Sequence, residues 1–152
     1  MNVSIIIPLL NESESINELN DWIFKAFTGT DLEFEIIYID DGSNDSSWSI
    51  IEEIAKSKIN VKGISFNRNY GKSQALRVGF SQAKGEYVAT LDADLQDSPE
   101  EIPIMINKLI ESNLDMISGW KKKRYDSFFL KKLPSSLFNF RSEERRVGKE
   151  CR

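Results

Sequence analysis

The chain has 152 residues and a net charge of −4, and 40% of its residues are hydrophobic. This length suits a single domain, the hydrophobic content supports a packed core, and the charge argues against a nucleic-acid partner. The chain has no histidine, which excludes Ser-His-Asp triads and histidine-ligated zinc, and its one cysteine, Cys151, excludes a disulfide within the chain.

The first half of the chain alternates between strand and helix patterns. Residues 3–8 are a short β-branched apolar run, typical of a strand buried on both faces, and a second such run spans residues 34–39. Between them, apolar residues recur at helical spacing: Ile16, Leu19, Ile23, Ala26 and Phe27. After the second run, Asp45 or Ser46 is expected to cap a helix that carries Trp48, Ile51, Ile54 and Ala55.

The second half continues the same alternation. We predict a third strand over residues 61–66 and a fourth over 86–91. The helix between them is expected to pack through a face of small and apolar residues: Ala75, Leu76, Gly79, Phe80 and Ala83. Residues 98–101 predict a helix start, with a capping box and proline at the first helical position, and residues 115–119 predict a short fifth strand.

Alternating strands and helices predict an α/β domain with a mainly parallel sheet and helices on both faces. Ligands bind such sheets at the carboxyl ends of the strands. Polar clusters follow the strands at residues 11–12, 40–41, 68–72 and 92–96. We therefore expect these four clusters to converge on one edge of the sheet.

Asp92-Ala-Asp94-Leu-Gln96 is the sharpest feature of the sequence. Alternate residues of an extended chain face the same way, so Asp92, Asp94 and Gln96 are expected to present three oxygen ligands together. Mg²⁺ and Mn²⁺ are usually held by one or two carboxylates plus ligand phosphates. The alternative is a solvated acidic turn that caps the next helix.

Other polar residues after the strands carry a double interpretation. Asp40 and Asp41 could accept hydrogen bonds from a nucleobase and ribose, or form an Asp-Gly turn. Asn11 and Glu12 favour helix capping when taken in isolation. Lys72 could reach a diphosphate from the start of its helix, or be a solvated lysine. Its loop is not a Walker A motif, because Phe66 stands where that motif needs glycine.

The pattern changes after Lys123. The basic run 121–124 could neutralise phosphate, and the aromatic and basic residues up to 140 could lie on an anionic membrane surface or form half of a core. Residues 141–152 are charged and have no apolar periodicity, so we interpret them as a foreign tail after a domain of residues 1–140. No apolar run can span a bilayer, and we expect a cytoplasmic protein that is soluble or peripheral.

Taken together, these residues resemble glycosyltransferase family 2, and within it the polyprenyl-phosphate sugar transferases similar to dolichol-phosphate mannose synthase. The resemblance covers residues 1 to about 140. The matching pieces are residues 3–8 with Asn11 and Glu12, 39–43 with Asp45, 68–72, 85–88, 91–97, Pro99 with Glu100, and Gly119 with the basic run to Asp126.

The resemblance implies a GT-A fold that holds a nucleoside-diphosphate sugar. It implies that Asp92, Asp94 and Gln96 hold Mg²⁺ or Mn²⁺, with the two aspartates serving catalysis. Pro8, Glu12 and Asp41 would contact the nucleoside, and Arg124 with Lys72 would offset phosphate charge. The expected reaction is inverting sugar transfer to a polyprenyl phosphate, in cell-envelope glycan synthesis at the inner face of the membrane.

Two other classes of protein use related sheets. A Mg²⁺-binding phospho-receiver has its acidic pair after the first strand, whereas the first strand here ends in Pro8. A sugar-phosphate nucleotidyltransferase usually has a glycine-rich loop at that point, and residues 9–12 contain no glycine. The acceptor-side segment that the resemblance implies is absent, so we expect the 152-residue chain to be poorly stable and to bind donor without turnover.

Overall fold

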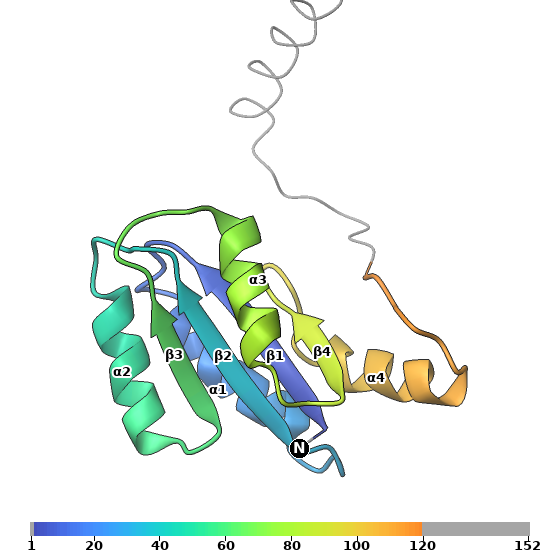
Figure 1. The fold of residues 1–152 in the computed structure, drawn as a ribbon. Helices are drawn as coiled ribbons and strands as arrows, with labels where there is room; N and C mark the ends of the chain where they lie inside the picture. The colour runs from blue at the N-terminus through green and yellow to red at the C-terminus, as the bar shows by residue number, and fades with distance from the viewer. Residues whose placement is uncertain (1, 120–152) are drawn as a thin grey trace, which may run out of the picture. The chain divides into compact units, whose positions relative to one another are not determined.

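The computed structural model describes residues 2–119. Its four-stranded sheet has the order β3-β2-β1-β4, and all pairings are parallel (Figure 1). The strands are β1 (Val3–Leu9), β2 (Phe34–Asp40), β3 (Val61–Ser65) and β4 (Tyr87–Thr90). The helices are α1 (Ile16–Phe27), α2 (Ser47–Ser57), α3 (Lys72–Gln82) and α4 (Glu101–Glu111).

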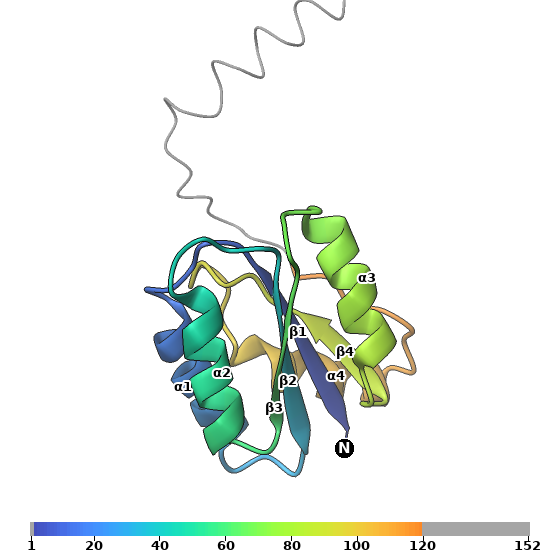
Figure 2. The same cartoon turned by 60° about the vertical axis from the view of Figure 1, so that its left-hand side comes forward.

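Helices cover both faces of the sheet, as the sequence predicts. Figure 2 shows α1 and α2 on one side and α3 on the other. All seven residues of β1 are buried, because alternate side chains enter two different cores. Ile5 and Ile7 join the larger core with α1, α2 and α4, whereas Ile6 joins a smaller core beneath α3. The prediction of a doubly covered α/β sheet is confirmed.

Helix α3 approaches β1 closely through Gly79. A Cβ atom at this position would lie 2.3 Å from Cγ2 of Ile6, so any side chain would force the helix away from the strand. Ala75, one turn earlier, is also buried. Phe80 was expected on this packed face but is 52% exposed. That prediction is wrong because Phe80 lies one residue past Gly79, about 100° around the helix from the packed face.

One predicted helix start and one predicted strand are also wrong. Helix α4 begins at Glu101, not at residue 99. No capping box forms, because the Ser98 hydroxyl donates to the Glu100 carboxylate at 2.6 Å and the Glu101 N–H donates to the Ser98 backbone carbonyl. Residues 115–119 form no strand. Their apolar part is only two residues long, and the Met116 side chain is 81% exposed, so no burial stabilises an extended chain there. Within residues 2–119, no helix is long and apolar enough to cross a membrane.

Candidate functional site

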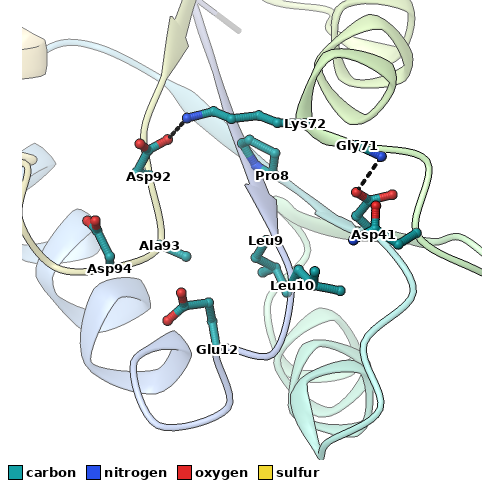
Figure 3. Close-up of a pocket in the computed structure, with 11 residues that line it drawn as sticks. Pro8, Leu9, Leu10, Glu12, Asp41, Gly71, Lys72, Asp92, Ala93 and Asp94 are labelled. Atoms are coloured by element: carbon teal, nitrogen blue, oxygen red, sulfur yellow. Dashed lines mark hydrogen bonds and ion pairs between the residues drawn. The ribbon is translucent and has the colours of Figure 1, made fainter. Parts of the chain in front are cut away.

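A cavity of about 310 Å³ opens at the carboxyl edge of the sheet (Figure 3). Six of the residues singled out from the sequence line it: Pro8, Glu12, Asp41, Lys72, Asp92 and Asp94. The other lining residues are Leu9, Leu10, Asn69, Gly71 and Ala93. The expected convergence of the polar clusters on one edge is therefore confirmed. Arg124 and the segment 121–140 lie outside the described residues.

Pro8 marks the point where the sheet opens into the cavity. The β1–β4 pairing ends at Ile6↔Thr90, after which the Leu91 N–H donates to the Ile6 carbonyl at 3.1 Å. The next ladder bond toward β4 would need an N–H from residue 8, and proline has none. On its other side β1 stays paired with β2 as far as Leu9↔Asp40. The chain after β4 can therefore separate from β1 at Pro8, and the cavity lies at this separation.

The loop after β1 is fastened to the loop after β2. The Asn11 N–H donates to Ser43 Oγ at 2.8 Å, and the Asn44 N–H donates to Asn11 Oδ1 at 2.8 Å. The Glu12 N–H donates to Ser47 Oγ at 2.9 Å. Asn11 adopts a φ of 57°, in the left-handed region that asparagine tolerates. Helix capping by Asn11 is thus the wrong interpretation, because its side chain joins two loops and holds Glu12 beside the cavity.

Asp45 extends this fastening and also caps α2. Its carboxylate accepts the Ser47 N–H at 2.9 Å and the Ser13 N–H at 3.1 Å. The hydrogen bonds from Ser47, followed by those from Ser13, lower the pKa of Asp45 to about 2. Of the two residues expected to cap α2, Ser46 stands at the N-cap position without a side-chain hydrogen bond, whereas Asp45 accepts the N–H of the first helical residue. Of the partner residues, Ser43 belongs to the piece 39–43 that carries the resemblance, whereas Asn44 and Ser47 have no sequence signal beyond being polar.

Asp41 is almost completely buried and binds the loop that follows β3. Its two carboxylate oxygens accept the N–H groups of Tyr70 and Gly71, each at 2.8 Å. The neighbouring Gly42 has a φ of 78°, and a Cβ there would lie 2.5 Å from the backbone carbon of Arg68. The two loops therefore meet backbone to backbone. Asp41 thereby fixes the loop that leads into Lys72.

Asp40 has a different and structural part in the same region. Its carboxylate accepts the Ser43 N–H at 3.0 Å and the Ser65 hydroxyl at 3.1 Å. Asp40 is buried and does not line the cavity. Of the two adjacent carboxylates, only Asp41 borders the space where a ligand would bind.

Lys72 begins α3 and reaches the opposite side of the cavity. Its Nζ lies 2.5 Å from Oδ1 of Asp92, and the two side chains are 59% and 42% exposed. Asp94 is exposed, and its carboxylate accepts the Gln96 N–H at 3.1 Å. Figure 3 shows the Asp92 and Asp94 carboxylates beside the same opening.

The backbone at residues 92–96 is not extended, which corrects the expectation from the sequence. Leu95 has a φ of 59°, so the chain turns and Gln96 does not line the cavity. Ala93 is buried and Leu95 packs against the larger core. The described residues hold no group of three or more acidic or cysteine side chains placed around one metal ion. Two carboxylates, Asp92 and Asp94, stand at the cavity, and the role of Gln96 as a ligand stays a prediction.

Curated relatives match most of the chain. A protein of Proteus mirabilis named undecaprenyl-phosphate 4-deoxy-4-formamido-L-arabinose transferase is 42% identical over 138 residues, which are 90% of this chain and 42% of that protein. A dodecaprenyl-phosphate galacturonate synthase of Rhizobium johnstonii is 32% identical over 141 residues, or 92% of this chain and 42% of that protein. The chain thus spans less than half the length of these relatives.

Solved structures share the fold. The S. aureus TarS structure in complex with UDP has a TM-score of 0.64 and 25% identity, and the match covers 87% of this chain and 40% of that one. The mannosyltransferase PcManGT from Pyrobaculum calidifontis, in complex with GDP-Man and Mn²⁺, has a TM-score of 0.61 and 25% identity over 71% of this chain and 32% of that one. These matches confirm the expected GT-A fold.

The family comparison covers almost the whole chain. The model described as Glycosyl transferase family 2 matches residues 4–151, a range that includes every residue lining the cavity. Neither the phospho-receiver nor the nucleotidyltransferase interpretation agrees with this match. The chain belongs to glycosyl transferase family 2.

Proposed function

We propose that this chain supplies the donor-binding part of an inverting glycosyltransferase that moves a sugar from a nucleoside-diphosphate sugar to a polyprenyl phosphate. The observation that carries the proposal is the gathering of Asp92, Asp94 and Lys72 around one cavity, beside Asp41. Residues 92–94 and the start of α3 lie on opposite sides of the opening, and the Lys72 side chain reaches across it to Asp92 (Figure 3). A ligand that carries both a metal ion and a phosphate could contact both sides.

The charge around the cavity argues for a divalent cation. Within residues 2–119, four carboxylates line it, those of Glu12, Asp41, Asp92 and Asp94, against the single ammonium of Lys72. A diphosphate alone would be repelled by this surplus of negative charge. Mg²⁺ and Mn²⁺ prefer carboxylate and phosphate oxygens together, and Asp92 and Asp94 fit that preference. Such an ion would stabilise the charge that develops on the leaving nucleoside diphosphate.

The remaining lining residues suit the nucleoside and the phosphates. The carboxylates of Glu12 and Asp41 can accept hydrogen bonds from ribose hydroxyls or a nucleobase N–H. Lys72 stands at the N-terminus of α3, where the helix dipole also favours phosphate. Pro8 offers an apolar surface at the base of the opening. We extend the phosphate-binding role to Arg124, on the resemblance alone.

The names of the two curated relatives support a polyprenyl phosphate as acceptor. A phosphate oxygen of that lipid is already anionic, so it can attack the anomeric carbon without a strong protein base. The new carbon–oxygen bond forms as the bond to the diphosphate breaks, and the configuration inverts. A chain without histidine is compatible with this chemistry. Because the acceptor is a membrane lipid, we infer action at the inner face of the membrane, with residues 121–140 as the candidate contact.

The metal assignment is tested by calorimetry with UDP, GDP, CDP and dTDP, each in Mn²⁺ and in EDTA. One of the four is expected to bind well in Mn²⁺ and at least tenfold more weakly in EDTA. Asp94→Asn should weaken binding in Mn²⁺ by roughly tenfold, because one anionic ligand becomes neutral. The unfolding temperature of the protein should not change, because Asp94 is exposed. Asp31→Asn, on the exposed loop before β2, is the matched control. Equal affinity in Mn²⁺ and EDTA would rule out the metal bridge.

A further inference from the structure

The Lys72 side chain pairs with Asp92, one of the two carboxylates proposed above to hold the metal ion. Its Nζ lies 2.5 Å from Asp92 Oδ1, and Figure 3 shows the side chain stretched from α3 across Pro8 to reach that carboxylate. Among the described residues that line the cavity, Lys72 is the one basic residue. The Lys72 ammonium thus balances the negative charge of Asp92.

The other carboxylates of the cavity are held by neutral donors. Asp41 accepts two backbone N–H groups, Glu12 accepts the Ser15 hydroxyl at 3.2 Å, and Asp94 accepts a backbone N–H from its own turn. The interaction described for Asp92 is with Lys72. Asp92 is therefore the carboxylate whose charge is balanced by a group that can leave without unfolding a loop.

The Lys72–Asp92 ion pair is weak enough for another cation to replace Lys72. Both side chains are about half exposed, and pairs of this kind shift an equilibrium by only about 1.5- to 5-fold. Lys72 is also the first residue of α3, so no preceding helical turn restricts the rotation of its side chain. A divalent cation at Asp92 would displace the ammonium, which then becomes available to a diphosphate.

Resting on the donor site proposed above, we propose that Lys72 is an exchangeable counter-ion that couples metal binding to diphosphate binding. Without donor, Lys72 neutralises Asp92 and weakens the binding of a metal ion alone. With donor, the metal binds Asp92 and Lys72 moves to the diphosphate. The metal thereby frees Lys72 for the diphosphate, and the diphosphate offers the displaced ammonium a new anionic partner. Because such coupling is reciprocal, metal and diphosphate tighten each other by the same factor.

The test compares Lys72→Met with the unsubstituted protein by electron paramagnetic resonance of Mn²⁺. Lys72→Met is expected to bind Mn²⁺ alone about 1.5- to 5-fold more tightly, because Asp92 loses its competing cation. The same variant should bind the preferred member of UDP, GDP, CDP and dTDP about tenfold more weakly in Mn²⁺, since a charged phosphate contact is lost. The coupling factor between the two ligands should fall.

Arg68→Met is the matched control for local charge. Arg68 lies on the same loop, but its guanidinium is 4.8 Å from the Tyr70 ring centre and does not pair with a carboxylate in the cavity. Its loss should leave the affinity for Mn²⁺ alone within error of the unsubstituted value. Circular dichroism of each variant checks the fold, and Lys72→Gln serves as a second neutral variant.

Two outcomes overturn the exchange: unchanged Mn²⁺ affinity in Lys72→Met, or an equal gain in Lys72→Met and Arg68→Met, which would reduce the effect to general charge. A different outcome contradicts the proposed function itself. If the unsubstituted protein binds none of the four nucleoside diphosphates in a metal-dependent way, the donor site fails, and the exchange fails with it.

Discussion

The Asp41 side chain both lines the cavity and holds the loop that follows β3. From the sequence, its carboxylate has two interpretations, as a nucleoside ligand or as part of a turn. The structure adds a third, because its two oxygens hold the Tyr70 and Gly71 N–H groups while the residue also borders the cavity. A carboxylate oxygen can accept more than one hydrogen bond, so the loop contacts leave room for a nucleoside contact.

Asp41→Ala is expected to lower the free energy of unfolding by about 1.5–3 kcal/mol, because two loop N–H groups lose an ionised acceptor. It should also weaken nucleoside diphosphate binding while the remaining binding stays dependent on Mn²⁺. Urea denaturation and calorimetry measure the two effects, with Asp31→Ala as the exposed control. An unchanged denaturation midpoint would show that the loop does not depend on this carboxylate.

Gly79 is the residue that sets the distance between α3 and β1. Gly79→Ala is expected to destabilise the protein by about 1–3 kcal/mol, because the new Cβ would lie 2.3 Å from Cγ2 of the fully buried Ile6. Gln74→Ala, on the exposed side of α3, is the control and should be close to neutral. Thermal denaturation decides this, and equal stability of the two variants would contradict the close packing.

At the scale of elements, the loops after β1 and β2 behave as one unit. Asp45 ties them together by accepting N–H groups from both Ser13 and Ser47. Because it is exposed, its contribution comes from local hydrogen bonds and not from burial.

Asp45→Ala is expected to cost about 1 kcal/mol near neutral pH, as lost helix caps usually do. The pKa of Asp45 is lowered to about 2, so its stabilising contribution is complete above the ordinary aspartate pKa of about 4 and is lost as the pH falls toward 2. The stability difference between the unsubstituted protein and Asp45→Ala should therefore shrink between about pH 4 and pH 2. A difference that stays constant over this range would contradict the carboxylate's role.

The elements differ in how far their sequences determine them. Strands β1 and β2 could be predicted because their apolar runs are continuous, and only a strand buried on both faces explains such a run in this length. The cavity could be predicted because parallel strands place their carboxyl ends on one edge. The contacts of Asn11 could not, because its partners Ser43 and Asn44 approach only after the sheet has formed. The turn at Leu95 could not either, because it requires a positive φ that leucine rarely adopts.

At the scale of the whole molecule, the arrangement of charge determines what the cavity can bind. Among the described residues, four carboxylates and one ammonium surround an opening of about 310 Å³ at the edge where the loops after all four strands meet. This arrangement suits a metal ion and a diphosphate together better than either ligand alone. The central claim is that Asp92 and Asp94 hold the metal that bridges the protein to the donor.

Anomalous diffraction at a manganese-sensitive wavelength tests this claim most directly, on crystals grown with Mn²⁺ and the preferred nucleoside diphosphate. The account predicts one strong anomalous peak between the carboxylates of Asp92 and Asp94 and the diphosphate oxygens, with Lys72 Nζ withdrawn from Asp92 toward a phosphate. A nucleotide bound in the cavity without a peak there, or a peak that touches neither aspartate, would contradict it.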